Sequence, residues 1–406
     1  MVPNGWSNTC IDDNITFSGG AQPPREVFKF EPEEGYIRLI QIRDYKSDKF
    51  ITYVPKKLAK KFCTADEVMI GRYGPPIFQI LRGIEGAYNV ALIKAIPKSG
   101  VDKEFMYYFL KRDPLLRVIE SFSQRTSGQT GIEMDVLKAY PMHLPPLPEQ
   151  RKIAQILSTW DRSIATTEKL IDASKQQKKA LMQQLLTGKK RLVDPETGKA
   201  FEGEWEEVKL GDVCIVNPKK TSEPENGLVS FIPMDAVSED AKLLRKEVKQ
   251  YSEVFKGFTA FIDGDVLVAK ITPCFENGKG AQVFGLENGV GFGSTEFHVL
   301  RAKKNISSEF IYFLTNTSGF RIRGEMNMQG SAGQKRVTTD YLKLYKMTIP
   351  KELSEQQKIA SVLTAADKEI ELLETKLAHF KQEKKALMQQ LLTGKRRVQV
   401  AETEVA

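Results

Sequence analysis

The sequence Lys178-Lys179-Ala180-Leu181-Met182-Gln183-Gln184-Leu185-Leu186-Thr187-Gly188-Lys189 occurs a second time, without a change, as residues 384–395. Around it, residues 149–191 and 355–397 align without a gap at an offset of 206, and 24 of the 43 aligned positions are identical. A weaker match at an offset of 205 relates Ser127-Gly128-Gln129 to Ala332-Gly333-Gln334. The chain is therefore a tandem duplication of one unit of about 200 residues.

Both copies of the repeated segment are predicted to be long helices. Pro148 and the capping box Ser354-x-x-Gln357 mark their starts, and Gly188 and Gly394 mark their ends. At ~1.5 Å per residue each helix would measure roughly 55–60 Å, which is more than one domain of this size covers. We therefore expect the helices to pair with each other; the alternative is that each packs on its own globular part.

Residues at alternating steps of 4 and 3 form the seam of a coiled coil in both helices. The seam residues are Ile153, Leu157, Trp160, Ile164, Thr167, Ile171, Ser174, Lys178, Leu181 and Leu185 in the first helix, and Ile359, Leu363, Ala366, Ile370, Leu373, Leu377, Phe380, Lys384, Leu387 and Leu391 in the second.

The two globular parts are predicted to be α+β domains with twisted sheets. Short alternating or β-branched runs predict strands at 36–42, 67–70, 89–93, 266–268 and 297–300, and residues 102–120 and 307–321 are predicted to be helical. The expected division of the chain is 1–145 for the first globular part, 146–191 for a central helix, 192–349 for the second globular part, 350–397 for a C-terminal helix and 398–406 for a tail.

Charge favours a polyanionic partner without requiring one. The chain has 406 residues, 41% of them hydrophobic and 28% charged, and a net charge of +8. The excess lies on the helical segments 149–191 (+6) and 355–397 (+3), whereas 1–148 carries +3 and 192–354 carries −2. No apolar stretch is long enough for a membrane span and no signal peptide is recognisable, so we expect a cytoplasmic protein.

Base reading by near-neutral domains requires local clusters of Arg, Lys, Gln or Asn, which make bidentate contacts to base edges. For each cluster alone, an ordinary surface patch is the alternative. The candidate DNA-binding residues are Arg38, Gln41, Arg43, Lys46 and Lys49; Arg72, Tyr73 and Arg82; Ser127 and Gln129; Lys219 and Lys220; Lys270 and Lys279; Arg321 and Arg323; and Gln334, Lys335 and Arg336.

Neither catalysis nor metal binding is indicated. The chain has no phosphate-binding G-x-x-x-x-G-K-[ST] loop, and Gly289-Val290-Gly291-Phe292-Gly293 lacks the surroundings of a dinucleotide site. The four cysteines contain no C-x-x-C pair and are interpreted as ordinary buried thiols, and the three histidines as packed or surface residues. We therefore expect no catalytic residue, no metal site and no cofactor on this chain.

Two variable domains alternating with two similar helices resemble the specificity subunits of type I restriction–modification systems. The resemblance rests on the motif Pro145-Pro146-Leu147-Pro148-Glu149-Gln150 with its copy Ser354-Glu355-Gln356-Gln357, and on the repeated Lys-Lys-Ala-Leu-Met-Gln-Gln-Leu-Leu-Thr-Gly. It covers nearly the whole chain. The Pro-Pro-Leu-Pro motif is degraded in the second copy to Pro350-Lys351-Glu352-Leu353.

The resemblance implies two target recognition domains, each reading one half of a bipartite DNA site, with an antiparallel coiled coil setting the separation. It implies two modification subunits that carry S-adenosylmethionine and methylate adenine, and restriction subunits that use ATP and Mg. In an antiparallel pair the seam numbers sum to about 540, which predicts contact between Trp160 and Phe380. Alternatives are a stand-alone architectural or regulatory DNA-binding protein that associates through its helices, and an enzyme with its own methyl-transfer site.

Overall fold

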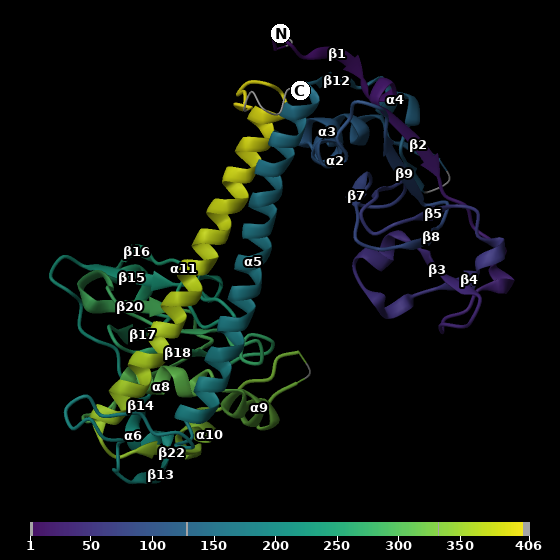
Figure 1. Cartoon of the computed structure of the whole chain (residues 1–406). Helices are drawn as coiled ribbons and strands as arrows, with labels where there is room; N and C mark the ends of the chain where they lie inside the picture. Colours follow the sequence, from purple (N-terminus) through teal and green to yellow (C-terminus); the bar gives the residue numbers. More distant parts are fainter. Residues whose placement is uncertain (1–2, 127–128, 332, 401–406) are drawn as a thin grey trace. The chain divides into compact units, whose positions relative to one another are not determined.

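The computed structural model describes residues 3–126, 129–331 and 333–400, in two compact units (Figure 1). Unit 1 comprises Met1–Glu168 and Lys376–Ala406, and unit 2 comprises Lys169–Thr375. Each unit holds one globular part and a portion of each 39-residue helix, α5 (Leu147–Leu185) and α11 (Leu353–Leu391).

Unit 1 contains two four-stranded sheets, in the orders β2-β9-β6-β7 and β4-β3-β8-β5. The first is antiparallel throughout, and in the second β3 and β8 are parallel. The pair β1·β12 and the hairpin β10·β11 complete the unit. The strands are β1 Ser7–Cys10, β2 Ile15–Gly19, β3 Tyr36–Ile40, β4 Tyr53–Pro55, β5 Phe62–Cys63, β6 Val68–Gly71, β7 Gln79–Leu81, β8 Gly86–Tyr88, β9 Leu92–Pro97, β10 Gln124–Thr126, β11 Gln129–Gly131 and β12 Pro141–Leu144.

Unit 2 repeats these orders as β14-β21-β18-β19 and β16-β15-β20-β17, with the pair β13·β22. The parallel neighbours are again the second and third strands of the second sheet, β15 and β20. The duplicated α+β fold is therefore confirmed. The strands are β13 Trp205–Lys209, β14 Cys214–Val216, β15 Leu228–Ile232, β16 Glu247–Gln250, β17 Thr259–Ile262, β18 Val266–Ala269, β19 Gly280–Gln282, β20 Val290–Gly293, β21 Phe297–Ala302 and β22 Lys346–Pro350.

Both predicted domain helices are broken in two. Residues 102–120 form α2 (Lys103–Leu110) and α3 (Asp113–Phe122), because Pro114 has no amide hydrogen and is best tolerated in the first turn of a new helix. Residues 307–321 begin α8 (Ser308–Thr315) and α9 (Ser318–Met326), where the Thr317 side chain accepts from the Phe320 amide and caps the second helix. The shorter helices are α1 Ile11–Asn14, α4 Met134–Ala139, α6 Leu210–Val213, α7 Tyr251–Val254 and α10 Thr339–Leu344.

The structure corrects the limits of two predicted strands and the position of one predicted helix cap. The run 89–93 becomes strand only at Leu92, because the Asn89 side chain accepts from the Ala91 amide and makes a turn. The run 36–42 ends at Ile40, where a 3-10 turn (Ile42–Tyr45) begins. Helix α11 begins at Leu353, so Ser354 lies inside its first turn and is not its cap.

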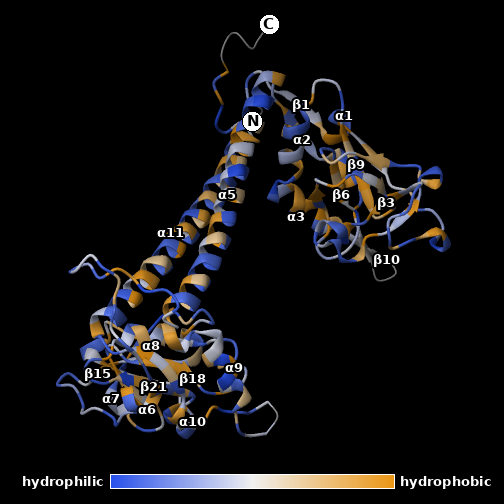
Figure 2. Ribbon diagram, turned by 60° about the horizontal axis from the view of Figure 1, so that its bottom comes forward, coloured by the Kyte–Doolittle hydropathy of each residue, from blue (hydrophilic) through white to orange (hydrophobic). Residues whose placement is uncertain are grey.

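Buried helix residues join each sheet system to the long helices. In unit 1, Phe105 and Leu115 share a core with Ile153, Leu157 and Leu391. Unit 2 uses Phe310, Leu342, Ile359, Leu363 and Leu185 in the same way. Every seam position of α5 and α11 is buried or half-buried, and apolar and polar residues alternate along both helices (Figure 2).

Within each unit the two helix portions run antiparallel. In unit 1 the rings of Trp160 and Phe380 pack edge to face, as the register predicts, and Asp161 binds Lys384. In unit 2 Lys178 binds Asp367 and Lys175 binds Glu374. Both helices end as predicted, with Gly188 and Gly394 at positive φ donating to the carbonyls of Leu185 and Leu391.

Candidate nucleic-acid interface

In unit 1, the end of β6 lies against the hairpin β10·β11. Tyr73 forms a bridge with Gly131, and the Ile132 amide donates to the Arg72 carbonyl at 3.2 Å. The Arg72 guanidinium lies over the Tyr73 ring, 5.2 Å from its centre. Arg72, Tyr73 and the strand that contains Gln129 are therefore neighbours, whereas Ser127 lies outside the described residues.

Unit 2 builds the same junction at the end of β18. The Val337 amide donates to the Lys270 carbonyl at 2.9 Å, and the Thr272 amide donates to the Lys335 carbonyl at 3.0 Å. Gln334 and Lys335 are exposed, and Lys270 is half-exposed. Candidate residues that are far apart in the sequence thus share one loop cluster, as they do in unit 1.

Arg336 belongs to this cluster, but its guanidinium is held by the protein. Its Nη2 and Nε lie 2.9 and 3.0 Å from the two carboxylate oxygens of Glu296. The hydrogen bond from Arg336 lowers the pKa of Glu296, which keeps this carboxylate ionised. A DNA contact by Arg336 would have to compete with this bidentate pair.

The candidate DNA-binding residues in and directly after β3 are only partly accessible to DNA. Arg38 binds Asp48 at 2.8 Å and lies beside the buried Asp44, and Gln41 donates to Thr52. Burial raises the pKa of Asp44. The most accessible candidates here are Arg43, Lys46 and Lys49, which are exposed.

Arg82 and Arg321 serve the fold. Arg82 makes a bidentate contact with Glu104 and lies 3.8 Å from the centre of the Tyr107 ring. Arg321 is 8% exposed and donates to the carbonyls of Phe275 and Gly278. The burial of Arg321 therefore conflicts with the prediction that it touches DNA. The helix that contains Arg321 mixes polar and apolar residues, so its sequence does not indicate which of its faces is buried.

The remaining candidates of unit 2 vary in accessibility. Lys219 is exposed, and Lys220 donates to the Phe255 carbonyl. Lys279 is half-buried at the end of the β18–β19 loop, and Arg323 donates to the Tyr345 hydroxyl. Of these four, Lys219 and Lys279 make no side-chain hydrogen bond or ion pair among residues 3–126, 129–331 and 333–400.

Burial shifts the pKa values of one histidine and one cysteine away from neutral pH. His298 is 3% exposed and contacts Asn217 and the Val337 carbonyl, and burial lowers its pKa. Burial raises the pKa of Cys63 to about 11, which makes this thiol unreactive. Contrary to expectation, Cys10 and Cys274 are only half-buried. In the described ranges, no three acidic, His or Cys residues gather as a metal site, and no helix is long and apolar enough to cross a bilayer.

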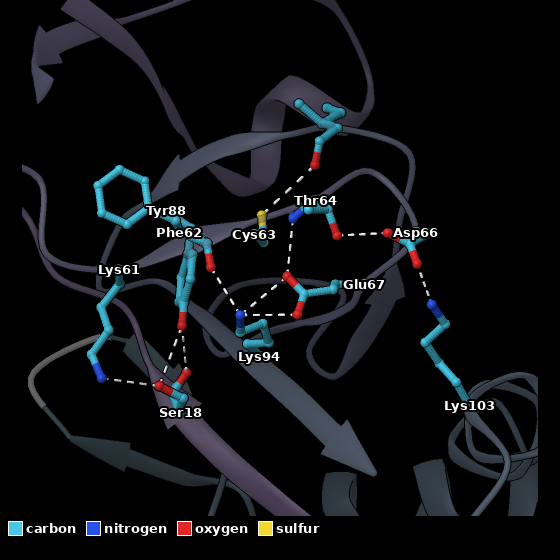
Figure 3. A network of polar contacts seen from close by, with 11 residues as sticks. Ser18, Lys61, Phe62, Cys63, Thr64, Asp66, Glu67, Tyr88, Lys94 and Lys103 are labelled. Atoms are coloured by element: carbon cyan, nitrogen blue, oxygen red, sulfur yellow. Dashed lines mark hydrogen bonds and ion pairs between the residues drawn. The ribbon is translucent and has the colours of Figure 1, made fainter.

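A network of polar contacts holds the two sheets of unit 1 together (Figure 3). Lys94 of β9 donates to Glu67 at 3.0 and 3.1 Å and to the carbonyl of Phe62 in β5. Tyr88 of β8 donates to Ser18 of β2. The contacts of Lys94 with Phe62 and of Tyr88 with Ser18 cross from one sheet to the other, so Lys94 has a structural role.

The sequence analysis missed a pair of glutamines that join each globular part to its helix. The Gln150 amide donates to the carbonyls of Gly100 and Pro145 and accepts from the Asp102 amide. In unit 2, Gln356 donates to the Pro350 carbonyl and accepts from the Ser307 amide. Both glutamines are fully buried, and they occupy equivalent positions of the repeat. Their identity in the two copies was the signal in the sequence that could have indicated a structural role.

Ion pairs at the helix ends repeat in the same manner. Arg397 makes a bidentate contact with Glu149 in unit 1, and Arg191 does so with Glu355 in unit 2. These residues and Asp161, Asp367, Lys178 and Lys384 are identical in both copies. The charged residues that are identical in both copies therefore include those that form ion pairs between α5 and α11.

Two α+β domains, each joined to an antiparallel helix pair and each with a polar loop cluster, define a protein built from a duplicated unit. The family model of the type I restriction modification DNA specificity domain matches residues 3–175 and again residues 202–382. The chain therefore belongs to this family.

Similar proteins agree with this assignment. The chain is 36% identical over 191 residues to the type I restriction enzyme EcoEI specificity subunit of Escherichia coli, covering 43% of this chain and about a third (32%) of the relative. It is 26% identical over 434 residues to the MjaVIII specificity subunit of Methanocaldococcus jannaschii, covering 98% and 94%. The crystal structure of the S subunit from M. genitalium has the same fold, with a TM-score of 0.56, 13% identity and coverage of 96% and 97%.

Proposed function

We propose that this chain is the non-catalytic subunit that reads a bipartite DNA target for a type I restriction–modification complex. The observation that carries the proposal is the loop cluster that occurs once in each unit, at Arg72 and Tyr73 and again at Lys270 and Lys335. Arg and Lys donate to guanine edges and to phosphates, so each cluster suits one half-site.

The proposed recognition domains are residues 1–145 and 192–349, and the proposed spacer helices are 146–191 and 350–397, with 398–406 as a tail. Exposed candidates such as Lys46, Lys219 and Lys335 are assigned to DNA contact, as is Gln129. Spacer helices suit a split site because a paired helix holds two readers at a fixed separation, which a flexible linker does not.

The proposed partners are two modification subunits, restriction subunits and double-stranded DNA. S-adenosylmethionine, ATP and Mg would be bound by those subunits. The globular parts are close to neutral, so partner subunits would supply much of the phosphate contact. A cytoplasmic location follows from this role.

The test is to map methylated adenines genome-wide in cells with and without this gene, and with residues 200–349 replaced by the matching domain of a relative. Loss of the gene should abolish methylation at one bipartite sequence. The domain replacement should change one half-site and leave the other half and the spacing intact. If methylation is unaffected by loss of the gene, the chain is a stand-alone DNA-binding protein instead; if both half-sites change together, the two readers are not independent.

A further inference from the structure

The loop cluster of unit 1 is held together by backbone contacts just after β6. The Arg72 amide donates to the Ala91 carbonyl at 2.8 Å, and the Ile132 amide donates to the Arg72 carbonyl at 3.2 Å. The next residue, Tyr73, forms a bridge with Gly131. These contacts bring residues from three separate segments of the chain to one place.

Unit 2 repeats this backbone arrangement just after β18 but carries different side chains on it. The Lys270 amide donates to the Glu296 carbonyl at 2.9 Å, the Val337 amide donates to the Lys270 carbonyl, and Ile271 forms a bridge with Arg336. Where unit 1 has Arg, Tyr, Ala and Gly, unit 2 thus has Lys, Ile, Glu and Arg. Different side chains on a shared backbone can give the two units different contacts with the same kind of partner.

The guanidinium of Arg336 is only partly engaged by the protein. Glu296 accepts from Nε at 3.0 Å and from Nη2 at 2.9 Å, and the Gln334 carbonyl accepts from Nη1 at 3.1 Å. An arginine has five N–H donors, so one on each terminal nitrogen is left without an acceptor in the part of the chain that the structure describes. The side chain is 40% exposed. Competition with Glu296 is therefore confined to the Nε side of the guanidinium.

Unit 1 orients its arginine with an aromatic ring in place of a carboxylate. The Arg72 guanidinium lies over the Tyr73 ring, 5.2 Å from its centre, and a stacked guanidinium still presents its donors at its edge. A Cβ added at Gly131 would touch the same ring at 3.4 Å. The ring therefore covers the place where a side chain at position 131 would begin, which is the position of Arg336 in unit 2.

Contact with phosphates alone would not account for Glu296. Phosphates attract any cation, and a carboxylate beside the cation repels them. Glu296 is nevertheless 26% exposed next to Arg336, and the hydrogen bond from Arg336 lowers its pKa, so it is ionised. A carboxylate in this position fixes the plane of the guanidinium. Guanine presents O6 and N7 as adjacent acceptors in the major groove, and an arginine with a fixed plane can donate to both.

We propose that Arg336 and Arg72 each read a guanine, one in each half-site, and that Glu296 and Tyr73 are the positioning residues that orient them. This assignment rests on the proposed function and names the base that each unit contacts. Lys335, which is exposed and has no fixed plane of donors, remains suited to a phosphate.

The experiment measures DNA binding by the full chain assembled with its modification subunits. The duplexes carry the mapped bipartite site, and each guanine in turn is replaced by 7-deazaguanine, which lacks the N7 acceptor. The wild-type complex should bind about tenfold more weakly when one particular guanine of either half-site is replaced. Arg336→Lys keeps the charge but loses the planar donors, so it should be insensitive to the replacement in one half-site and remain sensitive in the other. Arg72→Lys should show the reverse.

Variants of the positioning residues test orientation separately from stability. Glu296→Ala and Tyr73→Ala should reduce the sensitivity to N7 at the same guanine as Arg336→Lys and Arg72→Lys, and Tyr73→Phe should retain it because the ring remains. Glu296→Ala should also tighten binding to unrelated DNA, which a loss of stability alone does not produce. Arg245→Lys is the matched control, since Arg245 forms an exposed pair with Asp235 in the same unit. The thermal midpoint checks folding.

Half-sites without guanine would overturn the base assignment and leave the proposed function standing. The same conclusion would follow if the lysine variants bound every duplex more weakly but kept the wild-type sensitivity to N7, because the two arginines would then contact phosphates. If the wild-type complex prefers no bipartite sequence, the proposed function itself fails, and with it the reading of guanine.

Discussion

The ring of Trp160 meets the ring of Phe380 edge to face, with centroids 5.5 Å apart and planes at 82°. Both rings are half-buried in unit 1. An edge-to-face pair contributes about 0.5–1.5 kcal/mol beyond the area that it buries. This contact fixes which turn of α5 faces which turn of α11.

Truncating Trp160 to Ala should lower the free energy of local opening of α5 by about 2 kcal/mol, because a half-buried Trp loses about half of the 3–5 kcal/mol of a fully buried one. Hydrogen exchange of amides 155–165, followed by mass spectrometry, measures this. With Phe380→Ala and the double variant, the coupling should be about 1 kcal/mol. Additive effects would mean that the two rings do not interact.

Asp161 should make the stability of unit 1 depend on pH. Burial raises the pKa of Asp161, but hydrogen bonds from Lys384 and Tyr108 outweigh it, and the net pKa is lowered. A lowered pKa in the folded state stabilises the protein above the unfolded value of about 3.9, and this contribution is lost as the pH falls through the folded value.

The variant Asp161→Asn should therefore be about 1 kcal/mol less stable than wild type at pH 7, a figure reduced by the partial exposure of the carboxylate. The difference should shrink as the pH falls below about 4. Thermal unfolding at pH 7 and pH 3 measures it, and Asp172→Asn, which changes an exposed aspartate, is the control. A difference that does not change with pH would contradict the assigned ion pair.

Substitution of Arg321 should affect stability, whereas substitution of Lys335 should affect DNA binding. Arg321→Ala leaves the carbonyls of Phe275 and Gly278 without their donor and should destabilise unit 2 by about 3 kcal/mol. Lys335→Ala, at an exposed position, should leave the thermal midpoint unchanged and weaken DNA binding about equally for all sequences. Thermal unfolding and DNA titration of the assembled complex distinguish the two; the opposite pattern would reverse the assignments.

Inserting four residues after Thr167 should change the spacing that the complex tolerates while both half-sites stay the same. One added turn extends a helix by ~6 Å, which corresponds to roughly two base pairs. Sequencing of methylated sites in cells that carry the variant reads the spacing. Unchanged spacing with full methylation would show that the helices do not set the gap.

The repeat and the seam could be predicted from the sequence because both depend on periodicity. A step of 4 and 3 residues defines one face of a helix, and an offset of 206 relates the copies. The pairing of Trp160 with Phe380 could be predicted because a single sum of residue numbers defines an antiparallel register, and a sum of about 540 places large seam residues opposite large ones. Helix ends at Gly188 and Gly394 were equally predictable, since glycine at positive φ is a local signal.

The roles of individual cations could not be predicted from the sequence. Arg82 and Arg321 look like any other basic residue until the fold brings Glu104 to one and the Phe275 carbonyl to the other. Such partners are distant in sequence and set by tertiary packing. The buried glutamines Gln150 and Gln356 were missed for the same reason, although their identity in the repeat was visible.

Arg397 also donates to the carbonyl of Asn4, and Arg191 donates in the same way to the carbonyl of Gly203. In unit 2 this contact spans twelve residues of continuous backbone, whereas in unit 1 it joins residues near opposite ends of the chain. The backbone at Asn4 is thus physically equivalent to the backbone at Gly203, which follows Arg191 by a short connector. A permuted gene in which a short linker joins Arg397 to Asn4, and which is opened between Arg191 and Gly203, would encode a polypeptide with the same set of contacts.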